Sequence, residues 1–87
     1  NLYARLGTKN PNLCFAGHVD VVPEGNKEEW SFDPFSGEVQ DNMLLGRGSV
    51  DMKSSIASFI SAISSFIQEK PNFKDRGSIS LLITCLR

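Results

Sequence analysis

Apolar and polar residues alternate along the chain in a way that predicts three β-strands. Residues 2–6, "LYARL", alternate apolar with larger polar side chains, which indicates a half-buried strand that ends at Gly7. Residues 13–16 are continuously apolar between turn signals, as expected of a strand covered on both faces. A further apolar run over residues 79–84 predicts a last strand.

From about residue 52 to residue 69 the apolar positions follow the period of an α-helix. They recur three or four positions apart and define one face: Ile56, Phe59, Ile60, Ile63, Phe66 and Ile67. The opposite face is rich in serine, which is about 0.5 kcal/mol per position less favourable in a helix than alanine. This helix therefore needs a sheet to pack against, and Pro71 ends it.

A long loop and a hairpin are predicted between the second strand and the helix. Residues 23–37 show no periodicity and carry prolines and glycines near both ends, so they indicate an ordered loop. Three aromatic side chains are expected to hold this loop down: Trp30, Phe32 and Phe35. Residues 38–45 predict a β-hairpin around Asp41 and Asn42, because both residues tolerate a positive φ. The whole order indicates an α/β fold in which the helix is a crossover between sheet strands.

Composition and charge narrow the classes of function. The chain has 87 residues, and nine Lys and Arg against ten Asp and Glu give a formal net charge of −1. It has no basic stripe, so no nucleic-acid partner is expected. Its apolar stretches are far shorter than the roughly 18 residues of a membrane-spanning helix, so no membrane contact is expected. Because the chain starts and stops on predicted strands, we expect it to be a piece of a longer protein.

Two cysteines, Cys14 and Cys85, lie in apolar segments near opposite ends of the chain. Two buried free thiols are the expected state, and a disulfide or a metal-binding pair is the alternative.

The single histidine, His18, follows the second strand in the stretch "CFAGHVDVVPEG", two residues before Asp20. If strand alternation persists there, both side chains point to the same side. A neutral imidazole is the commonest metal ligand in proteins, and an acceptor must hold its other ring nitrogen, a contact that Asp20 can supply. Taken alone, the motif favours a simpler interpretation, namely a surface histidine and aspartate at a strand end.

A second candidate stretch is "GRGSVDMKSS", residues 46–55. Gly46 and Gly48 flank Arg47, which indicates a turn with backbone conformations that other residues resist. Asp51 stands at the predicted start of the helix, where backbone N–H groups and the helix dipole favour a negative charge. Asp51 is thus either a helix N-cap or a carboxylate aimed outward to bridge cations.

Together these stretches resemble a known family. "GHVDVVPEG", "W..DPFSG" and "GRGSVDMKSS" before an apolar helix occur in the order seen in the M20 family of co-catalytic zinc amidases and peptidases. The resemblance runs to about Thr84 and is strongest to members that release succinate from an N-succinyl amino acid. It implies a mixed β-sheet of the zinc-peptidase type with a crossover helix. Residues 1–87 would then be a partial catalytic domain, truncated at both ends and without the lid or dimerisation domain.

The resemblance also implies roles for three residues. His18 would ligate one zinc ion, Asp51 would bridge the two zinc ions of each subunit, and Asp20 would be the catalytic aspartate that hydrogen-bonds His18. The peptide bond between Asp51 and Met52 would be cis. Two cations held by such a bridge activate a water molecule and polarise the amide carbonyl, and Co²⁺ can substitute for Zn²⁺.

After Thr84 the sequence departs from this family. Relatives continue into an acidic stretch that holds the general-base glutamate and a zinc-binding glutamate, whereas this chain reads Cys85-Leu86-Arg87. The isolated chain is therefore expected to be inactive. Arg47 and Lys53, the nearby basic residues, are expected to be structural: Arg47 would stabilise its own turn, and Lys53 would cap the helix or pair with a carboxylate.

Two other interpretations stay open. One is another M20 deacylase or peptidase, such as an acetylornithine deacetylase, and the other is a non-catalytic truncated remnant. For the intact enzyme the resemblance implies a small-molecule N-succinyl substrate, lysine and diaminopimelate biosynthesis, a homodimer and a bacterial cytoplasm.

Overall fold

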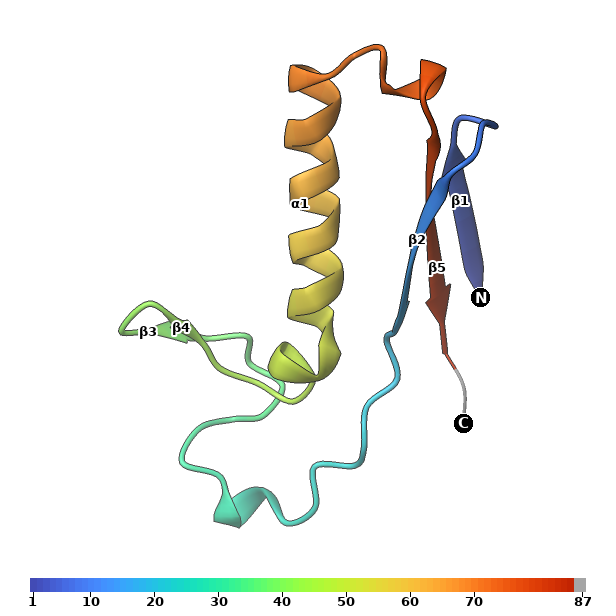
Figure 1. Ribbon diagram of the computed structural model, residues 1–87. Helices are drawn as coiled ribbons and strands as arrows, with labels where there is room; N and C mark the ends of the chain where they lie inside the picture. Colours follow the sequence, from blue (N-terminus) through green and yellow to red (C-terminus); the bar gives the residue numbers. More distant parts are fainter. Residues whose placement is uncertain (86–87) are drawn as a thin grey trace.

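The computed structural model describes residues 1–85, which form a three-stranded sheet, a long helix beside it and a small hairpin (Figure 1). The strands are β1 (Leu2–Leu6), β2 (Asn12–His18), β3 (Val39–Gln40), β4 (Met43–Leu44) and β5 (Ser78–Thr84). The helix is α1 (Ser54–Glu69), and short helical turns span Lys27–Glu29, Ser49–Lys53 and Phe73–Asp75. Leu86 and Arg87, where the sequence departs from its family, lie outside the described residues.

Strand β5 lies at the centre of the sheet, in the order β1-β5-β2. It pairs in parallel with β2, from Asn12 opposite Ser78 to His18 opposite Thr84, and antiparallel with β1. A parallel pair needs a crossover connection, and α1 supplies it. The expected α/β fold with a mixed sheet and a crossover helix is therefore confirmed. This register brings His18 to the carboxyl end of the parallel pair.

Helix α1 packs on β2 at Phe15 and Gly17. The rings of Phe15 and Phe59 stack with centroids 4.6 Å apart. A Cβ atom placed on Gly17 would lie only 2.9 Å from Cγ1 of Ile56, so a glycine is needed for this close approach. The serines of α1 are exposed, as predicted. The helix begins at Ser54 rather than at residue 52, because Asp51 and Met52 have non-helical backbone angles.

The predicted burial of β1 and β2 is wrong. All residues of β1 are exposed, and Leu13 in β2 is 62% exposed, because α1 covers one face of the sheet over β2 and leaves the rest open. Among the Val, Leu, Ile and Met side chains of residues 1–85, only Ile56 is buried. The radius of gyration is 16.6 Å, whereas a compact domain of this length has about 12 Å. The described chain is thus a thin, open layer.

The cysteines also differ in part from expectation. Cys14 and Cys85 are both free, as predicted, but both are exposed rather than buried. Cys14 precedes Phe15, which faces α1, so alternation along β2 turns its thiol to the uncovered face of the sheet.

The hairpin forms as predicted. Val39–Gln40 pairs with Met43–Leu44 around Asp41 (φ 51°) and Asn42 (φ 64°), the two positive angles of a tight hairpin turn.

The loop over residues 23–37 is anchored by two of its three aromatic residues. The Trp30 indole donates a hydrogen bond to the carbonyl of Glu24 (2.8 Å), and the Phe32 ring meets it edge-on at 5.5 Å. Phe35, in contrast, is 57% exposed, and the neighbouring Pro34 is buried in its place. Within residues 1–85, no helix is long and apolar enough to span a bilayer.

Candidate metal centre

The side chains of His18 and Asp51, distant in the sequence, meet at the carboxyl end of β2. Nε2 of His18 lies 3.1 Å from Oδ1 of Asp51. His18 comes from the end of a strand in the sheet, and Asp51 comes from the irregular turn Ser49–Lys53 before α1. The imidazole is partly covered, whereas the Asp51 side chain is 83% exposed. The second carboxylate oxygen of Asp51 therefore has room for a further ligand.

Asp51 is not a helix N-cap, so that interpretation is wrong. The N-cap position of α1 belongs to Lys53, which makes no capping hydrogen bond through its side chain. Asp51 itself has an extended backbone (φ −121°, ψ 93°), and its peptide bond to Met52 is cis, as the family resemblance implies. This local geometry turns the carboxylate toward His18 rather than toward the N–H groups of the helix.

Asp20 holds the His18 ring by its main chain rather than by its carboxylate. Nδ1 of His18 lies 3.0 Å from the carbonyl oxygen of Asp20 and 3.7 Å from its Oδ1, too far for a hydrogen bond. The predicted proximity of the two residues is thus present, but the atom that makes the bond is different. The reason is that pairing with β5 extends to the N–H of Val19, which donates to Thr84, and the backbone of Asp20 then faces the ring.

The hydrogen bond to Asp20 determines which nitrogen of His18 is free. A carbonyl oxygen only accepts, so Nδ1 carries the hydrogen, and in the neutral ring Nε2 has a lone pair. That lone pair faces a carboxylate oxygen, so the contact needs a proton or a metal cation between the two atoms. With bonds of about 2.1 Å, two ligands of one tetrahedral zinc ion lie about 3.4 Å apart. The 3.1 Å separation is close to this value, so His18 and Asp51 fit two ligands of a shared ion.

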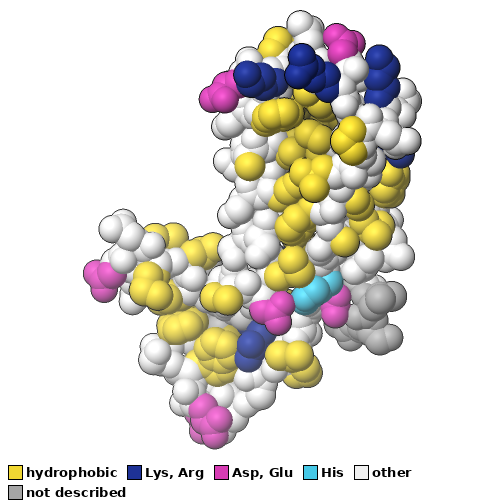
Figure 2. All heavy atoms as spheres, in the orientation of Figure 1, with side chains coloured by type: hydrophobic (Ala, Val, Ile, Leu, Met, Phe, Trp, Pro, Cys, Tyr) yellow, Lys and Arg dark blue, Asp and Glu magenta, His cyan; other side chains and the backbone are white. Residues whose placement is uncertain are grey.

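These side chains line a pocket of about 320 Å³. One wall is the segment from His18 to Val22, and the other is the turn from Gly46 to Asp51. Figure 2 shows the histidine with an acidic side chain on either side and a basic side chain nearby. Within residues 1–85, no group of three or more His, Cys, Asp or Glu side chains is arranged to hold a metal ion. The described chain thus offers a pair of donors, an incomplete ligand set.

The turn that carries Asp51 depends on a glycine, as predicted. Gly48 has a φ of 87°, and a Cβ atom there would lie 2.7 Å from Cγ1 of Val21. The N–H and hydroxyl of Ser49 both donate to the carbonyl of Gly46. Close packing of this turn on the end of β2 fixes Asp51 relative to His18.

The two basic residues near the site act differently from expectation. The N–H of Arg47 donates to the carbonyl of Pro34 (2.8 Å), and its guanidinium lies over the Trp30 ring, so it ties its turn to the preceding loop. Lys53 makes no ion pair within residues 1–85, nor does it cap α1. Trp30 was predicted only to hold the loop down; the signal that links it to the site is its place at the start of the motif "W..DPFSG".

Comparison with known proteins relates this site to a protein family. Residues 14–85 match the model of peptidase family M20/M25/M40. The chain is 58% identical over 84 residues to the succinyl-diaminopimelate desuccinylases of Ehrlichia chaffeensis and Rhodospirillum centenum, and 52% identical to that of Acinetobacter baylyi. Each match covers 97% of this chain but 21–22% of the relative, so the chain spans about a fifth of the length of these curated relatives.

Proposed function

Because this chain belongs to peptidase family M20/M25/M40, we propose that it forms part of the catalytic domain of a metal-dependent amidohydrolase. The proposed reaction is hydrolysis of N-succinyl-LL-2,6-diaminopimelate to succinate and LL-2,6-diaminopimelate. Identity of 52–58% to proteins named succinyl-diaminopimelate desuccinylase supports this choice of substrate. The observation that carries the proposal is the 3.1 Å approach of His18 Nε2 to Asp51 Oδ1.

In this proposal His18 and Asp51 would hold zinc, and Asp51 would be shared by the two ions. When bound, such a pair supplies a Lewis acid for the amide carbonyl and a water nucleophile at neutral pH. The main chain of Asp20 keeps the hydrogen on Nδ1, so that Nε2 stays available as a ligand. The Asp20 carboxylate, 3.7 Å from Nδ1, is proposed as the catalytic aspartate beside His18.

Other groups must complete the site. His18 and Asp51 are two donors, and each zinc ion takes about four ligands. We propose that the missing ligands and the general base belong to the portion of the relatives that this chain does not span, and that the chain alone does not hydrolyse the substrate. The intact enzyme is proposed to be a cytoplasmic homodimer with two Zn²⁺ per subunit, which Co²⁺ can replace.

A chimera tests this function. The 84-residue segment of this chain replaces its counterpart in the Ehrlichia chaffeensis enzyme, and release of succinate from N-succinyl-LL-2,6-diaminopimelate is measured against deacetylation of N-acetylornithine. We expect the succinyl substrate to be preferred. His18→Ala should lower kcat/KM by more than about a thousandfold, because several kcal/mol of transition-state stabilisation is lost. Asp41→Asn, in the remote hairpin turn, is the control. Preference for N-acetylornithine, or an active His18→Ala chimera, would contradict the proposal.

A further inference from the structure

Arg47 shares the pocket with Asp20 and Asp51, yet among residues 1–85 it forms an ion pair with neither. A guanidinium next to free carboxylates ordinarily pairs with one of them by two parallel hydrogen bonds. Here its central carbon lies 4.8 Å from the centre of the Trp30 ring instead. Nε of Arg47 is buried and has no hydrogen-bond partner in the described chain. An indole, the best aromatic partner for a cation, therefore takes the place of a carboxylate.

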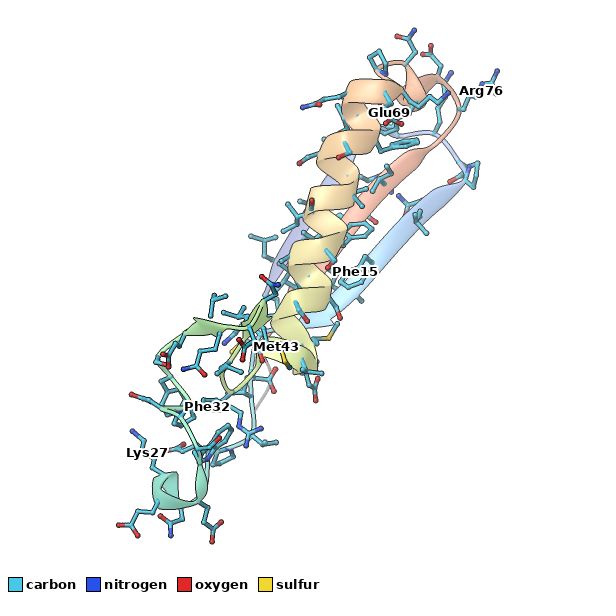
Figure 3. All side chains as sticks on the ribbon, turned by 90° about the vertical axis from the view of Figure 1, so that its left-hand side faces the viewer. Phe15, Lys27, Phe32, Met43, Glu69 and Arg76 are labelled. Carbon is cyan, nitrogen blue, oxygen red and sulfur yellow. The ribbon has the colours of Figure 1, made fainter. Side chains whose placement is uncertain are left out.

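Trp30 is itself held in place. Its indole N–H donates to Glu24, and Phe32 packs edge-on against the ring. The hydrogen bond from the Arg47 N–H to Pro34 joins the same loop to the turn that carries Asp51. Figure 3 shows this loop, with Phe32 and Lys27 labelled, beyond the start of α1 and far from Glu69 and Arg76. The loop thus fixes the indole ring that contacts the guanidinium, independently of the proposed metal ligands His18 and Asp51.

We propose that Trp30 is a positioning residue of the metal centre, which holds the Arg47 guanidinium away from Asp51 so that this carboxylate stays free for a cation. The inference rests on the proposed ligand role of His18 and Asp51. A guanidinium released from the indole would compete with the metal ion for the oxygens of Asp51, because both need the same lone pairs. Trp30 thereby prevents the Arg47 guanidinium from occupying the position of the metal ion.

The zinc affinities of single and double variants distinguish this role from that of a simple tether between two loops. If Trp30 and Arg47 only joined two loops, removing either or both would weaken metal binding by the same amount. If Trp30 sequesters a competitor, loss of the ring harms binding only while Arg47 is present. Removing both residues should then restore much of the affinity that loss of the ring alone costs.

The test is the Zn²⁺ affinity of the chimera with the Ehrlichia chaffeensis enzyme, which supplies the remaining ligands, measured by competition with a chromophoric chelator. Trp30→Leu removes the aromatic face but keeps bulk, and it should weaken binding about tenfold, the scale of a partly desolvated cation–π contact. Arg47→Ala should stay within about threefold of the wild type, and the double variant should match Arg47→Ala. Trp30→Phe keeps a weaker aromatic face and should lose about threefold, again restored by Arg47→Ala.

The chain offers a matched control. Phe35 carries a second cation–π pair, with Nζ of Lys27 5.1 Å from its ring, but it is 57% exposed and its cation, unlike Arg47, does not line the pocket. Phe35→Leu should leave zinc affinity unchanged. Far-UV circular dichroism checks that each variant folds. If Trp30→Leu does not fold, the comparison of Trp30→Phe with and without Arg47→Ala tests the inference instead.

Several outcomes would overturn the inference. Unchanged affinity in both Trp30 variants would overturn it, as would a double variant that binds no better than the Trp30 variant alone. Either result would leave the ligand role of His18 and Asp51 intact. Failure of the otherwise wild-type chimera to bind zinc at all would instead overturn that ligand role, and this inference with it.

Discussion

The two ends of α1 are built differently. Near its start, the segments around His18 and Asp51 meet through the 3.1 Å approach of their side chains and the close packing of Gly48 against Val21, and the guanidinium of Arg47 lies on Trp30 of the loop. Near its other end lies an open groove of about 1150 Å³ between the helix and the sheet. Its apolar lining comes mainly from Leu13, Phe59, Ile63, Phe66, Phe73 and Ile79. Figure 2 shows apolar side chains along this part of the molecule.

The difference separates the geometry of the site from the stability of the fold. At the metal end, short-range contacts within this chain fix the donor atoms, although few apolar side chains are buried there. At the groove end, the contacts are apolar and a large apolar surface stays exposed. Substitutions at the metal end should therefore change ion binding, whereas substitutions under α1 should lower the free energy of unfolding and leave ion binding unchanged.

The largest effect is expected at Asp51. Asp51→Asn removes the anionic donor that faces His18 and should weaken zinc binding by at least about a hundredfold, because carboxylate and imidazole ligands carry the affinity. Chelator competition on the chimera measures the change in zinc affinity. Asp41→Asn makes the same chemical change in the hairpin turn, and a comparable loss of affinity there would show that general charge, not ligation, explains the result.

Next comes Gly48→Ala, which tests the contact that fixes the turn. A Cβ atom would clash with Val21 at 2.7 Å and would sit at a φ of 87°, so we expect a cost of about 2–3 kcal/mol in unfolding free energy and weaker zinc binding. Gly37→Ala has a similar φ of 66° but meets nothing within 4 Å, and it should cost about 1 kcal/mol and leave zinc binding unchanged. Urea denaturation and zinc titration of both variants give the comparison. Equal effects would mean that the close contact does not matter.

A smaller effect is expected at Phe59, where the substitution should lower stability and leave zinc binding unchanged. Phe59→Ala removes the ring stacked on Phe15 and should lower the unfolding free energy by about 1–2 kcal/mol, less than for a fully buried ring. Zinc affinity of the folded protein should stay within about twofold, since the stack does not touch the pocket. Ile60→Ala, at a position 48% exposed, is the control and should cost less than about 1 kcal/mol. A large loss of zinc affinity in Phe59→Ala would show that the two ends are coupled.

The smallest effect is expected at Asp20. Asp20→Asn keeps the backbone carbonyl that holds Nδ1 of His18, so zinc affinity should change by less than about threefold. A loss of tenfold or more in the same titration would mean that the carboxylate, not the main chain, orients the ring.

The elements of the fold were predictable because each follows from a local pattern. The period of the apolar residues in α1, the short apolar strands and the turn residues Asp41 and Asn42 do not depend on distant contacts. Burial was not predictable in this way. The exposure of Leu13 depends on which face of the sheet α1 covers, and no pattern within β2 contains that information.

The proximity of the three candidate residues was predictable, and their contacts only in part. The motifs indicated His18, Asp20 and Asp51 as candidates, but strand alternation cannot tell a carboxylate contact from a carbonyl contact once pairing with β5 ends. The displaced start of α1 has a similar cause, because the irregular backbone of Asp51 and Met52 interrupts a pattern that reads as helical. The stack of Arg47 on Trp30 joins separate segments, so no local spacing indicates it.

The most direct test of the account is to locate zinc in crystals of the chimera with the Ehrlichia chaffeensis enzyme by anomalous scattering at the zinc absorption edge. We predict a zinc peak about 2.0–2.2 Å from both Nε2 of His18 and a carboxylate oxygen of Asp51. Zinc bound elsewhere, with Nε2 still hydrogen-bonded directly to Asp51 in the presence of excess zinc, would contradict the claim that these two side chains share a cation.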